Sequence, residues 1–186
     1  TYSVDTGGTF AATASEITDF VRDLTVESAT EVDLQENVGV AGKLTVDGEI
    51  SDESSNAPSI NLNADALSAA PTHEVDGRIG ASGTVTLNVQ SGATIEGEGA
   101  NSDFASEINN LKVQDPVAAT VKNVRAITGA VTLANNEADE TGSLDLQLAD
   151  AGENGDQVVG GDVTVNDNTL TLSSNVEVAG GTGASV

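Results

Sequence analysis

Acidic side chains are the residues of this sequence best suited to chemistry. The 186-residue chain has 30 Asp and Glu but only six Lys and Arg. Three groups of carboxylates lie on segments that we predict to be turns: Asp52 and Glu53; Asp139 and Glu140; and Asp150, Glu153 and Asp156. Carboxylate oxygens on turns are typical calcium ligands, although none of these groups has the spacing of an EF-hand. The sequence therefore predicts either calcium at one or more of these sites or solvated acidic turns, and no other cofactor.

The residues that catalysis usually requires are scarce. His73 is the single histidine, has no cysteine to complete a zinc site, and follows Pro71 and Thr72 in a segment that we predict to be an exposed loop. Val4-Asp5-Thr6-Gly7 resembles the active-site turn of aspartic proteases, but that site needs a second such turn, and none follows. The same segment, continued to Phe10, resembles the phosphate-binding start of actin-like ATPases, whose fold needs a far longer chain. We therefore expect the protein not to be an enzyme.

The net charge of −24 limits the partners. It repels nucleic-acid phosphates and anionic lipids, so we expect neither nucleic-acid binding nor insertion into a membrane, and no apolar run reaches the roughly 18 residues of a spanning segment. A chain without Cys or Met resists oxidation. A start at Thr1 suggests that a leader was removed, although a proteolytic fragment would look the same. These features predict a secreted protein, extracellular or on the cell surface, in a saline or calcium-containing medium.

Alternating apolar and polar residues dominate the chain and predict strands. The clearest segments are Leu24–Val26, Val38–Val40, Lys43–Asp47, Thr84–Val89, Ala130–Leu133, Leu144–Leu148, Asp162–Val165 and Thr169–Leu172. Breaks such as Asp47-Gly48 and Asn166–Asn168 are typical of turns between antiparallel strands. Because only Tyr2, Phe10, Phe20 and Phe104 are aromatic, the core must consist of small branched side chains. The sequence predicts a mostly β fold, an antiparallel β-sandwich.

Two segments show helical spacing instead. Ile17, Phe20, Val21 and Leu24 follow the pattern i, i+3, i+4, i+7, and Phe104, Ile108 and Leu111 follow i, i+4, i+7. The first predicts a short helix near residues 15–23, and the second predicts one near residues 103–110.

A shift of 87 residues suggests an internal repeat. It aligns Leu24 with Leu111, Val46 with Leu133, and Asp52-Glu53 with Asp139-Glu140. We interpret it as a tandem duplication, with halves at 1–99 and 100–186 that form two small units or one pseudo-symmetric domain with a shared core. A β-solenoid would show a repeat of about 20 residues, so the longer period favours the sandwich.

These expectations point to a structural protein. We expect a subunit of an extracellular homopolymer, such as a pilus-like filament, an S-layer or a matrix fibre, that assembles through strand edges or strand exchange. The segment Thr169–Val178 is the candidate donor strand. The alternative is an adhesin, a carbohydrate-binding domain or a virion-fibre module with a surface glycan as its partner.

Overall fold

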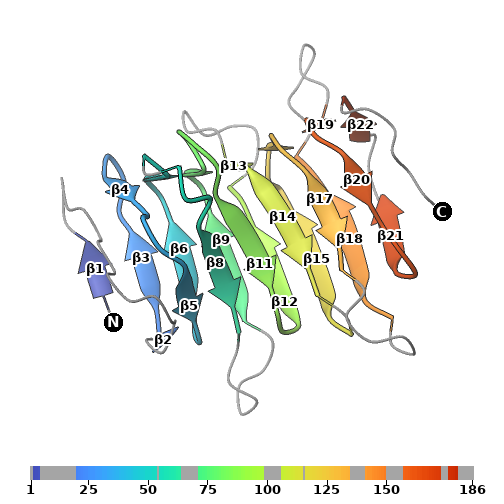
Figure 1. Cartoon of the computed structure of the whole chain (residues 1–186), viewed down its shortest axis with the longest axis horizontal. Coiled ribbons are helices and arrows are strands. Elements are labelled where there is room, and N and C mark those ends of the chain that lie inside the picture. Colours follow the sequence, from blue (N-terminus) through green and yellow to red (C-terminus); the bar gives the residue numbers. More distant parts are fainter. Residues whose placement is uncertain are drawn as a thin grey trace.

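The strands of this protein are all parallel. The computed structural model describes residues 2–4, 20–53, 55–63, 71–98, 106–114, 116–134, 141–149, 157–172 and 176–179. Within these residues the chain forms 22 strands and no helix, and successive strands pass in turn through three sheets (Figure 1). The fold is therefore a parallel β-helix, or β-solenoid, and the prediction of an antiparallel β-sandwich is wrong.

The three sheets are named I, II and III here, in the order in which each coil visits them. Sheet I contains β1 (Tyr2–Val4), β3 (Leu24–Val26), β6 (Leu44–Val46), β9 (Thr72–Val75), β12 (Ala93–Glu96), β15 (Ala118–Lys122), β18 (Ser143–Gln147) and β21 (Thr169–Leu172). Sheet II contains β4 (Glu31–Asp33), β7 (Glu49–Ser51), β10 (Arg78–Ile79), β13 (Glu107–Ile108), β16 (Ala126–Ile127), β19 (Gln157–Val159) and β22 (Val176–Val178). Sheet III contains β2 (Phe20–Val21), β5 (Val38–Val40), β8 (Ser59–Leu62), β11 (Thr86–Val89), β14 (Asn110–Val113), β17 (Val131–Leu133) and β20 (Val163–Thr164). Each sheet thus runs along the whole helix, with one strand from each coil.

The coils differ in length. Glu31 pairs with Glu49 in the next coil, whereas Ala126 pairs with Val158, which lies much farther along the chain. Such variation hides a solenoid period in the sequence, so the absence of a short constant repeat does not exclude a solenoid, contrary to the expectation above. The 87-residue shift relates β3 of sheet I to β14 of sheet III, so it is not a whole number of coils. The division into halves at residue 99 stays a prediction.

A corner between strands accounts for the described part of the second helical pattern. Ile108 in β13 and Leu111 in β14 are both buried, and the corner between these strands restarts the alternation, which leaves apolar residues three positions apart. The predicted helix near 103–110 is therefore wrong where the structure describes it, from residue 106 on. Near 15–23 the structure shows β2 at Phe20–Val21 instead of a helix, and residues 15–19 lie outside the described part.

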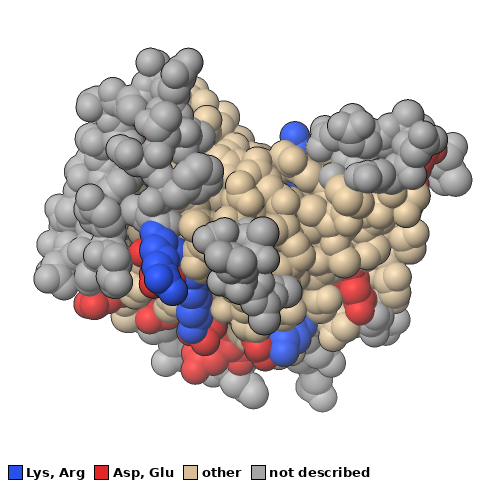
Figure 2. All heavy atoms as spheres, turned by 90° about the horizontal axis from the view of Figure 1, so that it is seen from below, with Lys and Arg blue, Asp and Glu red and all other residues tan. Residues whose placement is uncertain are grey.

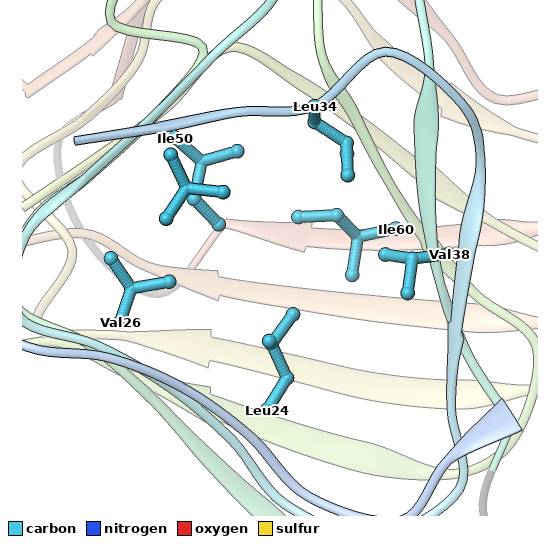
Figure 3. Close-up of a pocket in the computed structure, with 7 residues that line it drawn as sticks. Leu24, Val26, Leu34, Val38, Ile50 and Ile60 are labelled. Carbon is cyan, nitrogen blue, oxygen red and sulfur yellow. The ribbon is translucent and has the colours of Figure 1, made fainter. Parts of the chain in front are cut away.

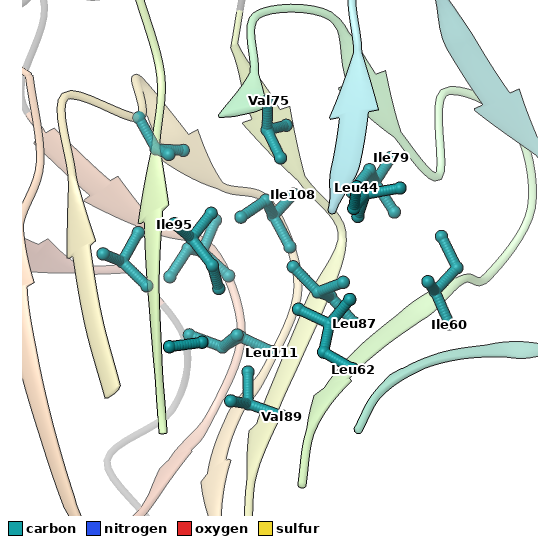
Figure 4. Close-up of a cluster of buried hydrophobic side chains, with 14 of the residues drawn as sticks. Leu44, Ile60, Leu62, Val75, Ile79, Leu87, Val89, Ile95, Ile108 and Leu111 are labelled. Atoms are coloured by element: carbon teal, nitrogen blue, oxygen red, sulfur yellow. The ribbon is translucent and has the colours of Figure 1, made fainter. Parts of the chain in front are cut away.

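The interior is aliphatic, as the composition predicts. In a parallel sheet the same side-chain position recurs in every coil, so inward residues form columns along the helix axis. The buried cluster consists only of Val, Leu, Ile and Ala, and Figure 4 shows its middle, with side chains from different sheets pointing toward one another. Three sheets that enclose so narrow a space leave little room for aromatic rings, and this explains their scarcity.

The two ends of the β-helix are formed by different strands. Strands β1, β4 and β2 are the outermost strands at the N-terminal end of the three sheets, and β21, β22 and β20 are the outermost strands at the other end (Figure 1).

Among the described residues, no α-helix is long and apolar enough to cross a membrane.

Candidate functional site

Two of the predicted calcium ligands lie at the end of β7. Asp52 is buried, and its carboxylate accepts hydrogen bonds from the backbone N–H groups of Asn56 (3.3 Å) and Ala57 (3.0 Å). Because these N–H groups lie four and five residues farther along the chain, the Asp52 carboxylate holds the loop that follows β7 in place. Glu53 is exposed, and its backbone N–H donates to the Asp33 carboxylate at 2.9 Å.

The other predicted ligands are Asp139, Glu140, Asp150, Glu153 and Asp156, and they lie outside the described residues, as do Asp5, Thr6 and Gly7. In the described part of the chain, no group of three or more His, Asp or Glu side chains is arranged to hold a metal ion. Calcium stays a prediction.

His73 is not an exposed loop residue. It lies in β9 with 1% of its surface exposed, and its Nδ1 accepts a hydrogen bond from the backbone N–H of Leu44 at 3.1 Å. Burial, together with the positive charge of Lys43, lowers the pKa of His73 from 6.5 to about 4. The ring is therefore neutral at physiological pH and is part of the core.

Ion pairs run along the outward sides of sheets I and II. On sheet I, register partners Glu74 and Glu96 would repel each other, but Lys43 approaches Glu74 to 2.7 Å and Lys122 approaches Glu96 to 2.9 Å. On sheet II, Arg78 lies between its register partners Glu49 (3.5 Å) and Glu107 (3.7 Å). Since each exposed pair contributes little stability by itself, the main effect of these cations is to relieve repulsion between stacked carboxylates.

A row of acidic residues also follows the corner between sheets I and II. Partial burial raises the pKa of Asp76, and the neighbouring charges of Glu98, Asp47 and Glu74 raise it further. This corner is thus a region of negative potential, although the described residues form no cation site there.

An aliphatic cavity lies inside the N-terminal coils. It has a volume of about 10 Å³ and is lined by Leu24, Val26, Val32, Leu34, Val38, Ile50 and Ile60 (Figure 3). No polar side chain lines it, and its space is about that of a single water molecule. It is a packing defect, not a ligand site.

The C-terminal coil leaves the end of the core open. One column of inward positions on sheet I passes through Ile95, Val121 and Leu146, each 0% exposed, and ends at Leu172, which is 47% exposed. Among the described residues, Leu172 is the only large hydrophobic residue whose side chain is exposed. The other inward residues of this coil are only partly buried: Val163, Leu170, Val176 and Val178.

Near the N-terminal end, the inward residues whose side chains the structure describes are buried. Val32 lies in the outermost strand β4, and Leu24 in β3 and Val38 in β5 lie one strand further in; each is no more than 6% exposed. Among the described residues, the exposed large apolar side chain therefore lies at the C-terminal end of the helix, beside the outer edges of β20, β21 and β22, which each have one neighbouring strand. This C-terminal end, formed by β20, β21 and β22, is the candidate functional site.

The chain was compared with protein families, curated proteins and solved structures. No protein-family model, curated protein or solved structure matches this chain.

The sequence contained a signal for this site. The segment Thr169–Leu172 alternates like the strands before it, and the predicted donor strand, Thr169–Val178, contains β21 and β22, the outermost strands of sheets I and II. The alternation could not reveal which strand it pairs with. In the structure β21 pairs with β18 along its whole length, so it offers one edge and not a free donor strand.

Proposed function

We propose that this protein is a structural subunit of an extracellular surface polymer, and that copies associate through the C-terminal end of the β-helix. The observation that carries the proposal is the exposure of Leu172 at the end of a column in which Ile95, Val121 and Leu146 are fully buried. An unpaired parallel edge and an open apolar interior favour a partner that continues both. A second copy of the chain has the required parallel strands.

The register of the sheets supports association from end to end. If the N-terminal end of one copy meets the C-terminal end of another, β1 lies against β21, β4 against β22 and β2 against β20, each within the same sheet. The three sheets then continue from one copy to the next, with all strands parallel. Such a head-to-tail contact is open-ended and produces a filament.

The charge of the chain sets the condition for assembly. A net charge of −24 on every copy opposes association at low ionic strength. At about 1 M salt the screening length falls to about 3 Å, and the repulsion between copies is largely removed. We therefore propose a saline or calcium-containing extracellular setting for the polymer.

The test is sedimentation velocity in 1 M NaCl on the wild-type chain and two single variants, Leu172→Lys and Thr171→Lys. Both variants add the same charge to β21, but Leu172 faces the open interior by register and Thr171 faces outward. A Leu contact buried on association contributes about 1.5–3 kcal/mol, so Leu172→Lys should weaken association about tenfold or more. Thr171→Lys should leave it near the wild-type value.

Two results would refute the proposal. One is a wild-type chain that stays monomeric at high concentration in salt, in calcium and in chelator. The other is association that Leu172→Lys and Thr171→Lys weaken equally, because the open interior would then have no part in the contact.

A further inference from the structure

Sheet III differs from the other two sheets on its outward side. The described outward positions of its strands β5 to β20 carry hydroxyl and amide side chains, with one glycine and one lysine: Gly39, Ser59, Asn61, Thr86, Asn88, Asn110, Lys112, Thr132 and Thr164. None of these is a carboxylate, although 30 of the 186 residues are acidic. On the side of the molecule that Figure 2 views, the described Lys, Arg, Asp and Glu side chains gather mostly toward the lower margin of the picture.

An amide network organises this face. Asn88 is 7% exposed although it points outward, and its side-chain N–H group donates to the Asn61 carbonyl oxygen at 2.7 Å. Gln114 donates to Asn88 and Gln90 donates to Asn61, each at 3.4 Å. The amides of neighbouring coils thus hold one another in fixed orientations along the helix axis.

Fixed amides suit a hydroxyl-bearing ligand. Each primary amide has two donor hydrogens and an acceptor oxygen with two lone pairs, so an amide in this network can still donate to or accept from a hydroxyl group. The repeat of the face follows the coil spacing of about 4.8 Å, which presents equivalent groups at regular intervals. We propose that the outward face of sheet III binds a neutral polysaccharide chain that lies along the helix axis.

The negative net charge of the protein favours a neutral polysaccharide over an acidic one. Sheets I and II carry rows of carboxylates, and an acidic polysaccharide would be repelled from the molecule as a whole. Sheet III is the side on which a neutral chain can approach without desolvating carboxylates. This inference does not depend on the proposed assembly through the C-terminal end.

The size of the face argues against a second copy as its occupant. Six strands at about 4.8 Å and four residues at about 3.3 Å give a strip of roughly 24 by 13 Å. Two such strips bury about 600 Å² in total, well below the roughly 1,000 Å² that a specific protein interface needs. A thin extended chain fits the strip better than a folded partner does.

Affinity gel electrophoresis tests the proposal with soluble β-glucan, mannan and xylan as neutral probes and alginate as the acidic probe. At least one neutral probe should retard the wild-type chain, and 0.5 M NaCl should not weaken the retardation. The variant Gln90→Glu keeps the shape of the side chain but adds a charge and removes a donor. Loss of one hydrogen bond, about 1 kcal/mol, should weaken binding about fivefold.

The matched control is Gln147→Glu on sheet I, whose amide also donates to a neighbouring side chain, Asp145, at 2.7 Å. It should bind like the wild type. Retardation by no neutral probe, or equal loss in Gln90→Glu and Gln147→Glu, would overturn the proposal. A concentration-dependent dimer that Gln90→Glu abolishes without any glycan binding would assign the face to self-association and overturn it as well.

Discussion

His73 occupies a core position that aliphatic residues occupy in the neighbouring coils. It pairs in register with Ile95 of β12, and its Nδ1 accepts from Leu44 of β6. The backbone N–H of Leu44 thus finds a buried acceptor, which spares the chain the cost of an unpaired donor. The ring serves this purpose only while it is neutral.

The first prediction concerns His73 and pH. Its pKa is about 4 in the folded chain and 6.5 for an unperturbed histidine, so between these values the unfolded chain binds a proton that the folded chain does not. The free energy of unfolding is highest above pH 6.5 and falls by about 1.4 kcal/mol per pH unit down to pH 4, about 3 kcal/mol in all. Urea denaturation at pH 7, 6, 5 and 4 measures this slope.

The variant His73→Leu should remove that slope between pH 6.5 and 5, where no other side chain of the sequence ordinarily titrates. Leucine fits a column that already contains Leu44 and Ile95, so the variant should still fold. An identical pH dependence in wild type and variant would show that His73 is not buried in its neutral form.

His73 could have been recognised from the sequence by its neighbours. In Thr72-His73-Glu74-Val75 the alternation places His73 on the same side of the strand as Val75, which is 0% exposed. Pro71, two residues before His73, favours a loop. In the sequence alone this signal is stronger than the alternation, because the strand has only four residues.

The corners are the elements that make the coils stack. Val46-Asp47-Gly48-Glu49-Ile50 joins β6 to β7, and in the next coil Val75-Asp76-Gly77-Arg78-Ile79 joins β9 to β10. The backbone N–H groups of Asp76 and Gly77 both donate to the carbonyl of Val46 at 2.8 Å. At Gly77 a β-carbon would collide with the carbonyl oxygen of Gly48 in the preceding coil, so the close stacking requires glycine.

The second prediction tests this corner. Gly77→Ala should lower the free energy of unfolding by about 1–3 kcal/mol or more, because backbone atoms must move apart. The control is Asp76→Ala at the preceding residue. It removes a carboxylate whose pKa is raised by partial burial and by neighbouring negative charges, so it should not destabilise the chain at pH 7. Thermal unfolding of both variants gives the answer, and equal stability of Gly77→Ala and wild type would contradict the stacking described here.

Strand positions were predictable, but strand pairing was not. Each of the eight alternating segments contains a strand, because period two reports which side chains face the core. Alternation is the same for parallel and antiparallel strands, so Asp47-Gly48 fits a hairpin turn in the sequence although it forms a corner between two sheets. The recurrence of Val-Asp-Gly-x-Ile, first at Val46 and again at Val75, was the available signal of a coil.

At the scale of the whole molecule, the charge and the open end act against each other. The carboxylates keep copies apart, and the exposed Leu172 favours their association. Calcium would shift this balance, but Asp52 is engaged with backbone N–H groups, and all the predicted ligands other than Asp52 and Glu53 lie beyond the described residues. Composition predicted the aliphatic core, whereas the exposure of Leu172 follows from its place in the outermost strand of sheet I, which the sequence alone does not reveal.

X-ray fibre diffraction from oriented filaments grown in 1 M NaCl tests end-to-end association most directly. If coils stack from copy to copy, the strands lie perpendicular to the filament, and the reflection at about 4.8 Å falls along the filament axis. The account predicts this reflection on that axis and its loss in preparations of Leu172→Lys. A reflection at about 4.8 Å perpendicular to the filament axis, or a wild-type chain that forms no filament in salt or calcium, would contradict it.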